Sequence, residues 1–417
     1  MFSRRLKTGY LVLEGLNSFA VVYYFYYLYF FMQKEHGFGN KDNLTLAALN
    51  GATYALFAWF GGRFGQRFGY FRALKVGFLV MAAALAVGSQ LKSTAGHITV
   101  MVVTVFGMSF TWPTLEALVS EGESRAGLQH MLGLYNVVWA ATASIASFTG
   151  GVMLDQLGLP SLFYVPIGFL TLQVVLTFWL EARARAAGQR RIERPAGASL
   201  QDPDSSNEAS RPTAAASGSA ALSLPSDHAI HPRAKTFQRL AWLANPFAYI
   251  ALNTTIAIIP GVAARLNLST TAAGFFCSVW CFARFGAFWT LWLWDGWHYR
   301  FRWLLVAYVV LVSTFAAISM VPNLAVIVTA QVLFGAAIGL MYYSSLFYSM
   351  DASETKGDHG GIHESAIGLG NLAGPAIGAA ALQFLPQFPH SGMVAVSLLL
   401  LGGLFGLTAI WRAGGTS

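Results

Sequence analysis

Twelve long apolar blocks restrict the folds that this chain can adopt. They fall at roughly 9–32, 43–62, 73–91, 97–119, 130–154, 159–181, 241–263, 271–294, 302–320, 322–349, 362–385 and 391–411. An α-helix of about 20 residues spans about 30 Å of hydrocarbon. Strands of a membrane barrel would alternate apolar and polar residues, and these blocks do not. The sequence therefore predicts an all-α membrane protein with twelve transmembrane helices, whose surroundings are a lipid bilayer.

Composition excludes several other classes of protein. Of the 417 residues, 55% are hydrophobic and 11% are charged, whereas soluble domains have about 25% charged residues. The net charge of +8 is not gathered on a basic face between the apolar blocks, so no nucleic-acid partner is expected. Cys277 and Cys281 share one apolar block and are expected to be small core residues. His359 and His363 beside Glu364 lack further ligands, so we expect no metal site and no cofactor.

Residues 182–236 differ from the rest of the chain. They are rich in Ser, Ala, Pro and charge, with hardly an aromatic residue. Such a segment cannot bury enough apolar surface to fold. We therefore predict a disordered linker at 182–236 between an N-terminal six-helix bundle, 1–181, and a C-terminal six-helix bundle, 237–417.

The basic residues predict how the chain lies in the membrane. If both termini are on one side, 21 of the 26 Lys and Arg residues fall in segments on that side and four fall in loops on the other. Basic loops favour the cytoplasmic face. Both termini and the linker are therefore predicted to be cytoplasmic, in a multi-pass protein of the cell (inner or plasma) membrane.

A glycine-rich basic turn joins the second and third blocks and reads "GGRFGQRFGYFR". It is similar to the pattern G-x-x-x-D-R-x-G-R/K-R/K of the major facilitator superfamily. Gly62, Arg67 and Gly69 fit this pattern, and Gln66 stands where the family has an acid. Six spans, a linker and six more spans also resemble this family over nearly the whole chain.

Other motifs match the family less closely. Arg125 lies in a stretch that resembles the turn between spans 4 and 5, and Asp295 supplies an acid in the corresponding turn of the second half. The G-P-x-x-G-G pattern of drug–proton antiporters and the P-E-x-x-x-R signature of sugar porters are missing. The resemblance implies a monomeric transporter with a central cavity lined by spans 1, 4, 7 and 10 and by faces of spans 2, 5, 8 and 11. It does not assign a subfamily.

The missing acid at Gln66 suggests an altered gate. In the family, the acid of this turn is thought to face the start of span 11, where this chain carries Glu364. One hypothesis is that Arg63 or Arg67 pairs with Glu364 and closes the cytoplasmic side. The alternative is that Glu364 is simply favoured in the first turn of a helix by the helix dipole.

Few ionisable residues lie inside the blocks, and such residues are costly in a membrane. Arg284 is the deepest and needs either an acidic partner or an anionic ligand. A fixed ion pair between helices and a contact with substrate or coupling ion both satisfy that need.

Glu14 and Glu116 are candidates for proton coupling. Each lies about one turn inside the predicted cytoplasmic boundary, and Asn17 follows Glu14 on the same helix face. Removal from water disfavours the charged form of a carboxyl, as proton coupling requires. Pairing with Arg4, Arg5 or the loop arginines is the alternative.

Further polar and aromatic residues could line a solute site, because such sites combine apolar walls with a few polar groups. Helix packing is the competing role for each aromatic residue. The candidates are Asn136, Trp139, Asn253, Trp280, Tyr343 and Asn371.

The sequence thus predicts secondary active transport of a small organic solute by alternating access, coupled to protons, and no enzyme activity. No G-x-x-x-x-G-K-[ST] loop for nucleotide occurs, so a gradient must supply the energy. An exporter of amphipathic compounds, a lipid mover and a non-transporting membrane sensor are the alternatives.

Overall fold

The regular structure of the chain is entirely α-helical in the part that the computed structural model describes, residues 4–123, 125–192, 232–351 and 358–414. Twelve stretches are long and apolar enough to span a membrane. The predicted all-α fold with twelve spans is therefore confirmed. The helices are α1 (Arg4–His36), α2 (Asn40–Phe68), α3 (Tyr70–Gly88), α4 (Thr94–Met108), α5 (Trp112–Ser120), α6 (Arg125–Gln156), α7 (Ser161–Ile192), α8 (Ala234–Arg265), α9 (Thr270–Phe276), α10 (Val279–Leu293), α11 (Phe301–Met320), α12 (Leu324–Asp351), α13 (Asp358–Phe384) and α14 (Ser391–Gly414).

Two of the spans consist of two helices each. In the fourth span, α4 ends at Met108 and α5 begins at Trp112, directly before Pro113. Proline has no N–H for the preceding turn and its ring clashes with that turn, so a break here is expected. In the eighth span, α9 and α10 are separated at Cys277 and Ser278. These breaks set the direction of the helices that carry the site described below.

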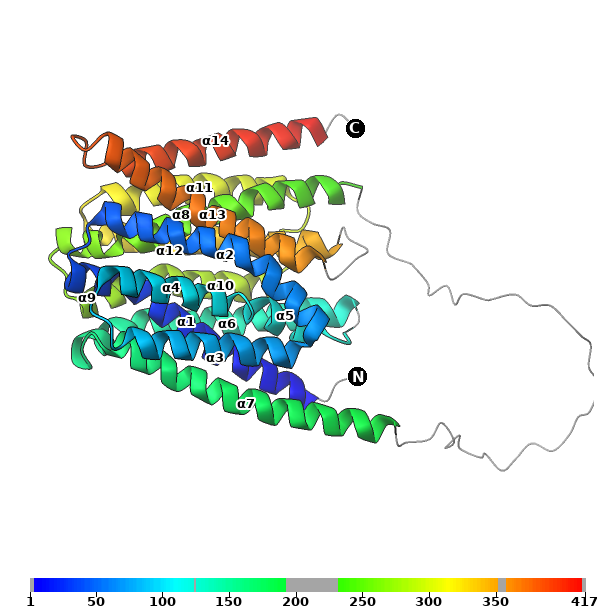
Figure 1. Cartoon of the computed structure of the whole chain (residues 1–417). Helices are drawn as coiled ribbons and strands as arrows, with labels where there is room; N and C mark the ends of the chain where they lie inside the picture. Colours follow the sequence, from blue (N-terminus) through cyan, green and yellow to red (C-terminus); the bar gives the residue numbers. More distant parts are fainter. Residues whose placement is uncertain (1–3, 124, 193–231, 352–357, 415–417) are drawn as a thin grey trace, which may run out of the picture.

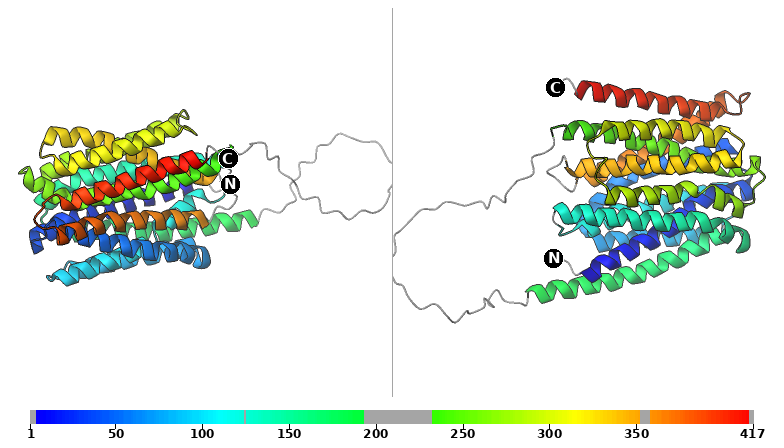
Figure 2. Two further views of the ribbon diagram at one scale, coloured as in Figure 1. Left: turned by 90° about the horizontal axis from the view of Figure 1, so that it is seen from above. Right: turned by 180° about the vertical axis from the view of Figure 1, so that it is seen from behind.

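The helices run side by side and form two halves, α1–α7 and α8–α14 (Figures 1 and 2). Within the first half α1 packs on α6 and α7, and within the second α10 and α11 pack on α12. The halves meet where α2 packs on α13 and where α6 packs on α9 and α10. Helix α1 begins and helix α14 ends on the same side of the bundle, which is here named the terminal end.

The sixth span extends beyond the predicted start of the linker. Helix α7 continues to Ile192, and α8 already begins at Ala234. Alanine and arginine favour helix, and Arg185 Nη2 donates to Glu181 Oε1 over 2.7 Å, one turn apart. The predicted linker therefore begins too early, and its remaining part, 193–231, lies outside the described residues.

The glycine-rich turn packs closely against the fourth span. Gly69 has φ +98°, a conformation that glycine adopts readily, and its N–H donates to the carbonyl of Gly65 over 2.9 Å. A Cβ placed on Gly61 would lie 2.0 Å from the carbonyl oxygen of Ser109. The backbone of α2 therefore touches the chain at the break between α4 and α5.

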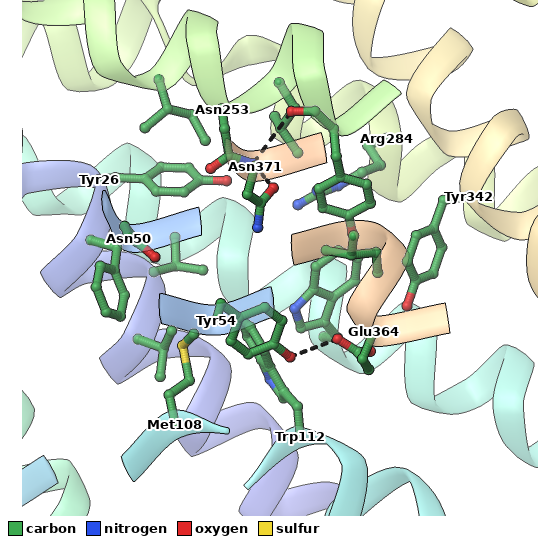
Figure 3. A pocket seen from close by; sticks show the side chains of 18 of the residues that line it. Tyr26, Asn50, Tyr54, Met108, Trp112, Asn253, Arg284, Tyr342, Glu364 and Asn371 are labelled. Carbon is green, nitrogen blue, oxygen red and sulfur yellow. Dashed lines mark hydrogen bonds between the residues drawn. The ribbon is translucent and has the colours of Figure 1, made fainter. Parts of the chain in front are cut away.

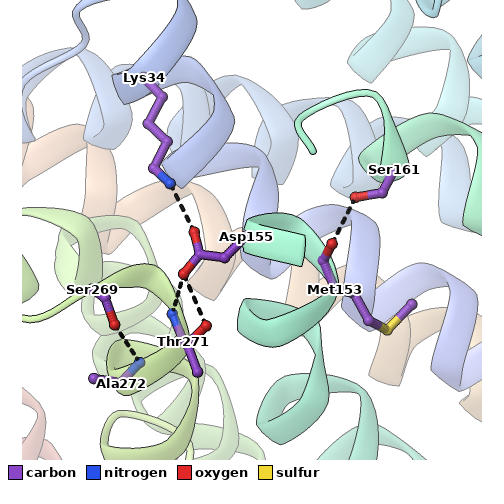
Figure 4. Close-up of polar contacts among 7 residues, drawn as sticks. All are labelled: Lys34, Met153, Asp155, Ser161, Ser269, Thr271 and Ala272. Atoms are coloured by element: carbon purple, nitrogen blue, oxygen red, sulfur yellow. Dashed lines mark hydrogen bonds and ion pairs between the residues drawn. The ribbon is translucent and has the colours of Figure 1, made fainter. Parts of the chain in front are cut away.

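At the end of the bundle opposite the termini, Asp155 of α6 connects the two halves (Figure 4). Asp155 Oδ2 accepts from the backbone N–H of Thr271 over 2.8 Å and from its hydroxyl over 2.9 Å. Its other oxygen lies 3.1 Å from Lys34 Nζ. Nearby, a Cβ on Gly151 would lie 2.3 Å from the carbonyl oxygen of Thr270. The halves are thus in direct contact at this end.

We expect Asp155→Ala to open this end. Loss of the charged acceptor should shift the equilibrium between the closed and the open form of this end toward the open form by about 1–2 kcal/mol, or about 5- to 30-fold. Electron–electron distance measurements between spin labels on Leu157→Cys and Phe388→Cys, both exposed side chains, would report a longer distance population. Asp42→Ala is the matched control, because Asp42 accepts from the N–H of Gly39 within its own half. An unchanged distance distribution in Asp155→Ala would show that the Asp155 contacts do not hold this end of the bundle closed.

Candidate functional site

A pocket lies between the two halves, with about 880 Å³ of open space including its mouth (Figure 3). Residues from α1, α2, α4, α5 and α6 form one wall, and residues from α8, α10, α12 and α13 form the other. Pockets at such interfaces are the usual place for small ligands. The lining residues are Val21, Val22, Phe25, Tyr26, Asn50, Tyr54, Met108, Trp112, Glu116, Tyr135, Trp139, Tyr249, Leu252, Asn253, Ile256, Arg284, Tyr342, Glu364, Ile367 and Asn371.

Arg284 brings a buried cation to this pocket. Its side chain is 2% exposed, and its guanidinium carbon lies 4.3 Å from the ring centroid of Trp139 and 4.9 Å from that of Trp280. Among the described residues, its Nε and Nη2 have no hydrogen-bond partner and it forms no salt bridge. Cation–π contacts offset part of the desolvation cost, but two donors stay unsatisfied. The predicted alternative of a fixed ion pair therefore finds no partner in the described part of the chain.

Two amides lie beside Arg284. Asn253 Nδ2 donates to Asn371 Oδ1, which joins α8 to α13. Tyr26 of the other half stacks on Trp280, with ring centroids 5.9 Å apart. Polar and aromatic groups therefore meet from both halves around the guanidinium.

Two carboxyl groups line the same pocket. Glu364 Oε2 accepts from the hydroxyl of Tyr54 over 2.6 Å, which links α13 to α2. Glu116 of α5 has no ion-pair partner within the described residues. The predicted alternative, pairing of Glu116 with arginines at the surface, is thus not seen there.

The hypothesis of a Glu364 latch on the basic turn differs from what the structure shows. Arg63 lies over the ring of Trp59 at 3.8 Å, and Arg67 lies 5.3 Å from the ring of Phe68. Glu364 instead faces Tyr54 in the pocket. The reason is that α13 begins at Asp358, so Glu364 is no longer in the first helical turn.

The charges are separated along the pocket. Glu364 lies near the terminal end of α13, and Asn371 is two turns further along, about 10 Å away at 1.5 Å per residue. Arg284 lies near the middle of the eighth span, Thr270–Leu293, on the side of the pocket away from Glu364. Figure 3 places Glu364 and Tyr54 on one side and Arg284 and Asn371 on the other. The pocket therefore has a basic part and an acidic part.

Five candidates from the sequence do not line the pocket, and Tyr343 is one of them. Glu14 is buried and accepts from the hydroxyl of Ser18 over 2.7 Å. Asn17 and Asn136 are buried, and Trp280 packs behind Arg284. These side chains belong to the surrounding core, and Trp280 touches the charged lining residue Arg284.

Tyr343 is one residue away from the lining position. Its neighbour Tyr342 lines the pocket. Tyr343 packs on Phe288 and Trp297, with ring centroids 6.0 and 5.8 Å apart. The sequence also missed several lining residues, and only the polar Asn50 gave a signal comparable with that of the predicted amides. The missed polar and aromatic residues are Phe25, Tyr26, Asn50, Tyr54, Trp112, Tyr135 and Tyr249.

The remaining gate candidates lie at the terminal end. Gly62 faces Pro113, whose Cβ would be 3.8 Å from an added Cβ. Gln66 and Asp295 are exposed. Arg125 begins α6, and its side chain lies outside the described residues. Their role in gating stays a prediction.

Twelve spans in two halves around a central polar pocket define the architecture of a membrane transporter. The family model for the Major Facilitator Superfamily matches residues 10–375. The chain therefore belongs to the Major Facilitator Superfamily, as its motifs predicted. No curated protein sequence matches it.

Solved structures with the same fold include several transporters. The nucleoside transporter NupG is 12% identical, with 98% of this chain and 99% of that chain covered and a TM-score of 0.66. The human organic anion transporter MFSD10 (TETRAN) is 15% identical, with 98% and 100% covered and a TM-score of 0.66. A structure of proton dependent oligopeptide transporters is 14% identical, with 98% of each chain covered and a TM-score of 0.67. Because their solutes differ and identity is low, these similarities establish the fold and not the solute.

Proposed function

We propose that this protein is a secondary active transporter that carries a small organic solute across the membrane by opening the two ends of the central pocket in turn. The observation that carries this proposal is the pocket between the halves, in which an arginine without a salt bridge among the described residues and two carboxyl groups face a wall of aromatic and aliphatic side chains. Charged side chains in a transmembrane segment are costly and are kept for function. The two halves are joined at Asp155 by hydrogen bonds. We propose that these bonds break when this end of the pocket opens.

We further propose that Glu116 and Glu364 carry the coupling protons. Both line the pocket, and Glu364 accepts a hydrogen bond from the Tyr54 hydroxyl. In a closed pocket the neutral form of a carboxyl is favoured by its desolvation, and contact with water allows the proton to leave. Opening of each end in turn would therefore let these groups load and release protons on different sides.

The proposed orientation follows the distribution of basic residues. The terminal end would face the cytoplasm, and the end with Asp155 would face outward. The protein would act as a monomer in the cell (inner or plasma) membrane.

The test uses purified protein in liposomes that contain a pH-sensitive dye. We expect addition of a transported solute to produce a proton flux that the dye reports. We also expect an imposed pH gradient to drive uptake of labelled solute. The solutes are an organic anion, a neutral aromatic amide, a sugar and an amphipathic cation, with protein-free liposomes as control. Solute uptake that ignores the gradient would disprove proton coupling, and no uptake of any of them would contradict transport of these classes.

Export of amphipathic compounds is the second candidate, and the aromatic lining favours it. The same assay separates the two, because in proton antiport the solute and the proton move in opposite directions. Lipid movement would instead appear as transfer of labelled lipid between leaflets, and a sensor would show neither flux.

A further inference from the structure

We infer that the transported solute is an organic anion with a carboxylate and an aromatic or similarly planar body, and that the carboxylate binds Arg284. This inference rests on the proposed transport through the central pocket. It adds the chemical class of the solute and its orientation, with the carboxylate near α10 and the apolar body among the rings of the lining.

The state of Arg284 is the first argument. A guanidinium that is 2% exposed and has two nitrogens without hydrogen-bond partners is a costly arrangement unless a ligand completes it. Its planar fork of donors matches the two oxygens of a carboxylate. Among the described residues it has no salt-bridge partner with which a ligand would compete.

The rings around Arg284 are the second argument. Trp139 and Trp280 lie at 4.3 and 4.9 Å from the guanidinium carbon and hold it in position. A side chain fixed in this way loses less conformational freedom when the ligand binds. A carboxylate that reaches Arg284 therefore meets a guanidinium whose orientation is already fixed by the two rings.

The rest of the lining defines the body of the solute. Trp139 packs against Tyr342 with ring centroids 5.6 Å apart, and Tyr342 lies 6.2 Å from Tyr249. These rings offer flat apolar surfaces, on which aromatic groups pack favourably. The amides of Asn50, Asn253 and Asn371 add sites for a hydroxyl or carbonyl substituent.

A cationic solute fits this arrangement less well. The acidic part of the pocket already has an internal contact, since Glu364 accepts from Tyr54. Its carboxyls are also the groups proposed to bind protons, and a protonated carboxyl does not attract a cation. The unsatisfied charge is on Arg284, so the net preference is for an anion.

The experiment measures binding to the purified full-length protein at pH 6 by calorimetry. The five probes differ in one property each: 3-phenylpropionate, its neutral amide 3-phenylpropanamide, the cation 3-phenylpropylamine, the zwitterion phenylalanine, and propionate, which lacks the ring. We expect 3-phenylpropionate to bind at least about 10-fold more tightly than each of the other four. The amide and the amine lack the carboxylate, propionate lacks the ring that packs on the lining, and phenylalanine carries an ammonium group that Arg284 repels.

Variants assign the effect to Arg284. Arg284→Gln should weaken binding of 3-phenylpropionate by about 10-fold or more and leave the weaker binding of the amide unchanged. Arg284→Lys should restore part of the affinity, since it keeps the charge but not the planar fork. Arg265→Gln is the matched control, because Arg265 Nη2 bonds to the carbonyl of Ser319 outside the pocket. Thermal unfolding of each variant checks that it folds.

Tighter binding of the amine, the amide or phenylalanine than of 3-phenylpropionate would overturn the inference, and so would equal loss of amide and anion binding in Arg284→Gln. Absence of 3-phenylpropionate binding to the wild-type protein would also overturn it. Proton-coupled uptake of a sugar or cation in liposomes would then leave the proposed function standing without the anion.

Discussion

Glu364→Gln is expected to reduce proton-driven accumulation sharply while exchange of solute across the membrane continues. With an imposed gradient of two pH units, one proton per solute supports accumulation of up to about 100-fold, because each unit corresponds to about 1.36 kcal/mol. Under the same gradient the variant should accumulate solute at least about 10-fold less than the wild-type protein. Uptake of labelled 3-phenylpropionate into liposomes, with and without unlabelled solute inside, measures accumulation and exchange separately.

The physical reason is repulsion in the pocket. Glu116 and Glu364 face the space in which an anion would bind Arg284. In a low-dielectric site, an anion and two carboxylates destabilise one another. Protonation of a carboxyl therefore favours anion binding, and by reciprocity the bound anion favours protonation. This linkage makes the proposed transport a symport of anion and proton.

Glutamine imitates the protonated carboxyl and can still accept the hydrogen bond of Tyr54. Between pH 5.5 and 7.5, the anion affinity of Glu364→Gln should therefore fall less than that of the wild-type protein, because only Glu116 of the two proposed proton carriers still titrates. Glu35→Gln is the matched control, because Glu35 is exposed outside the pocket. Accumulation by Glu364→Gln equal to that of the wild-type protein would show that Glu364 does not carry the coupling proton.

The number of spans could be predicted because the length of an apolar block is enough to identify a transmembrane helix. The internal breaks were harder to predict. Pro113 explains the interruption between α4 and α5. The interruption between α9 and α10 falls at Cys277 and Ser278, and neither is a helix-breaking residue. Their conformation depends on tertiary contacts, including the bond that the side-chain amide of Gln331 on α12 donates to the carbonyl of Phe276.

The site residues that the sequence indicated are those whose residue type is rare within the apolar spans. Arg284 and Glu116 are conspicuous because charge is nearly absent from the spans, and the structure places both at the pocket. Tyrosine is not informative in the same way, since the chain has 16 of them. Neighbouring residues on a helix point about 100° apart, so Tyr342 faces the pocket and Tyr343 does not. The rotation of each helix comes from packing that the sequence alone does not give.

Gly51→Val is expected to eliminate transport by separating the two halves. Helix α2 packs closely on α13 at this point, because a Cβ on Gly51 would lie 2.3 Å from the backbone carbon of Asn371. The contact continues one turn along, where a Cβ on Gly368 would lie 2.5 Å from the Cα of Ala55. Backbone atoms cannot move aside like the end of a flexible side chain. The two helices must therefore shift apart.

This separation acts directly on the pocket. Asn371 and Glu364 lie on the same face of α13 as Gly368, and Tyr54 lies beside Ala55 on α2. The hydrogen bond between Tyr54 and Glu364 spans 2.6 Å and crosses this interface. Displacement of α13 by the width of a side chain would break it and move the proton-binding group away from the solute.

Forcing a large residue into a packed interface costs about 1–3 kcal/mol, so a lower midpoint of thermal unfolding should accompany the loss of transport. Gly402→Val on α14 is the matched control, because nothing lies within 4 Å of a Cβ added there. Liposome uptake and thermal unfolding of both variants test the expectation. Wild-type transport by Gly51→Val would mean that α2 and α13 tolerate separation, and that the interface between the halves does not need this close contact.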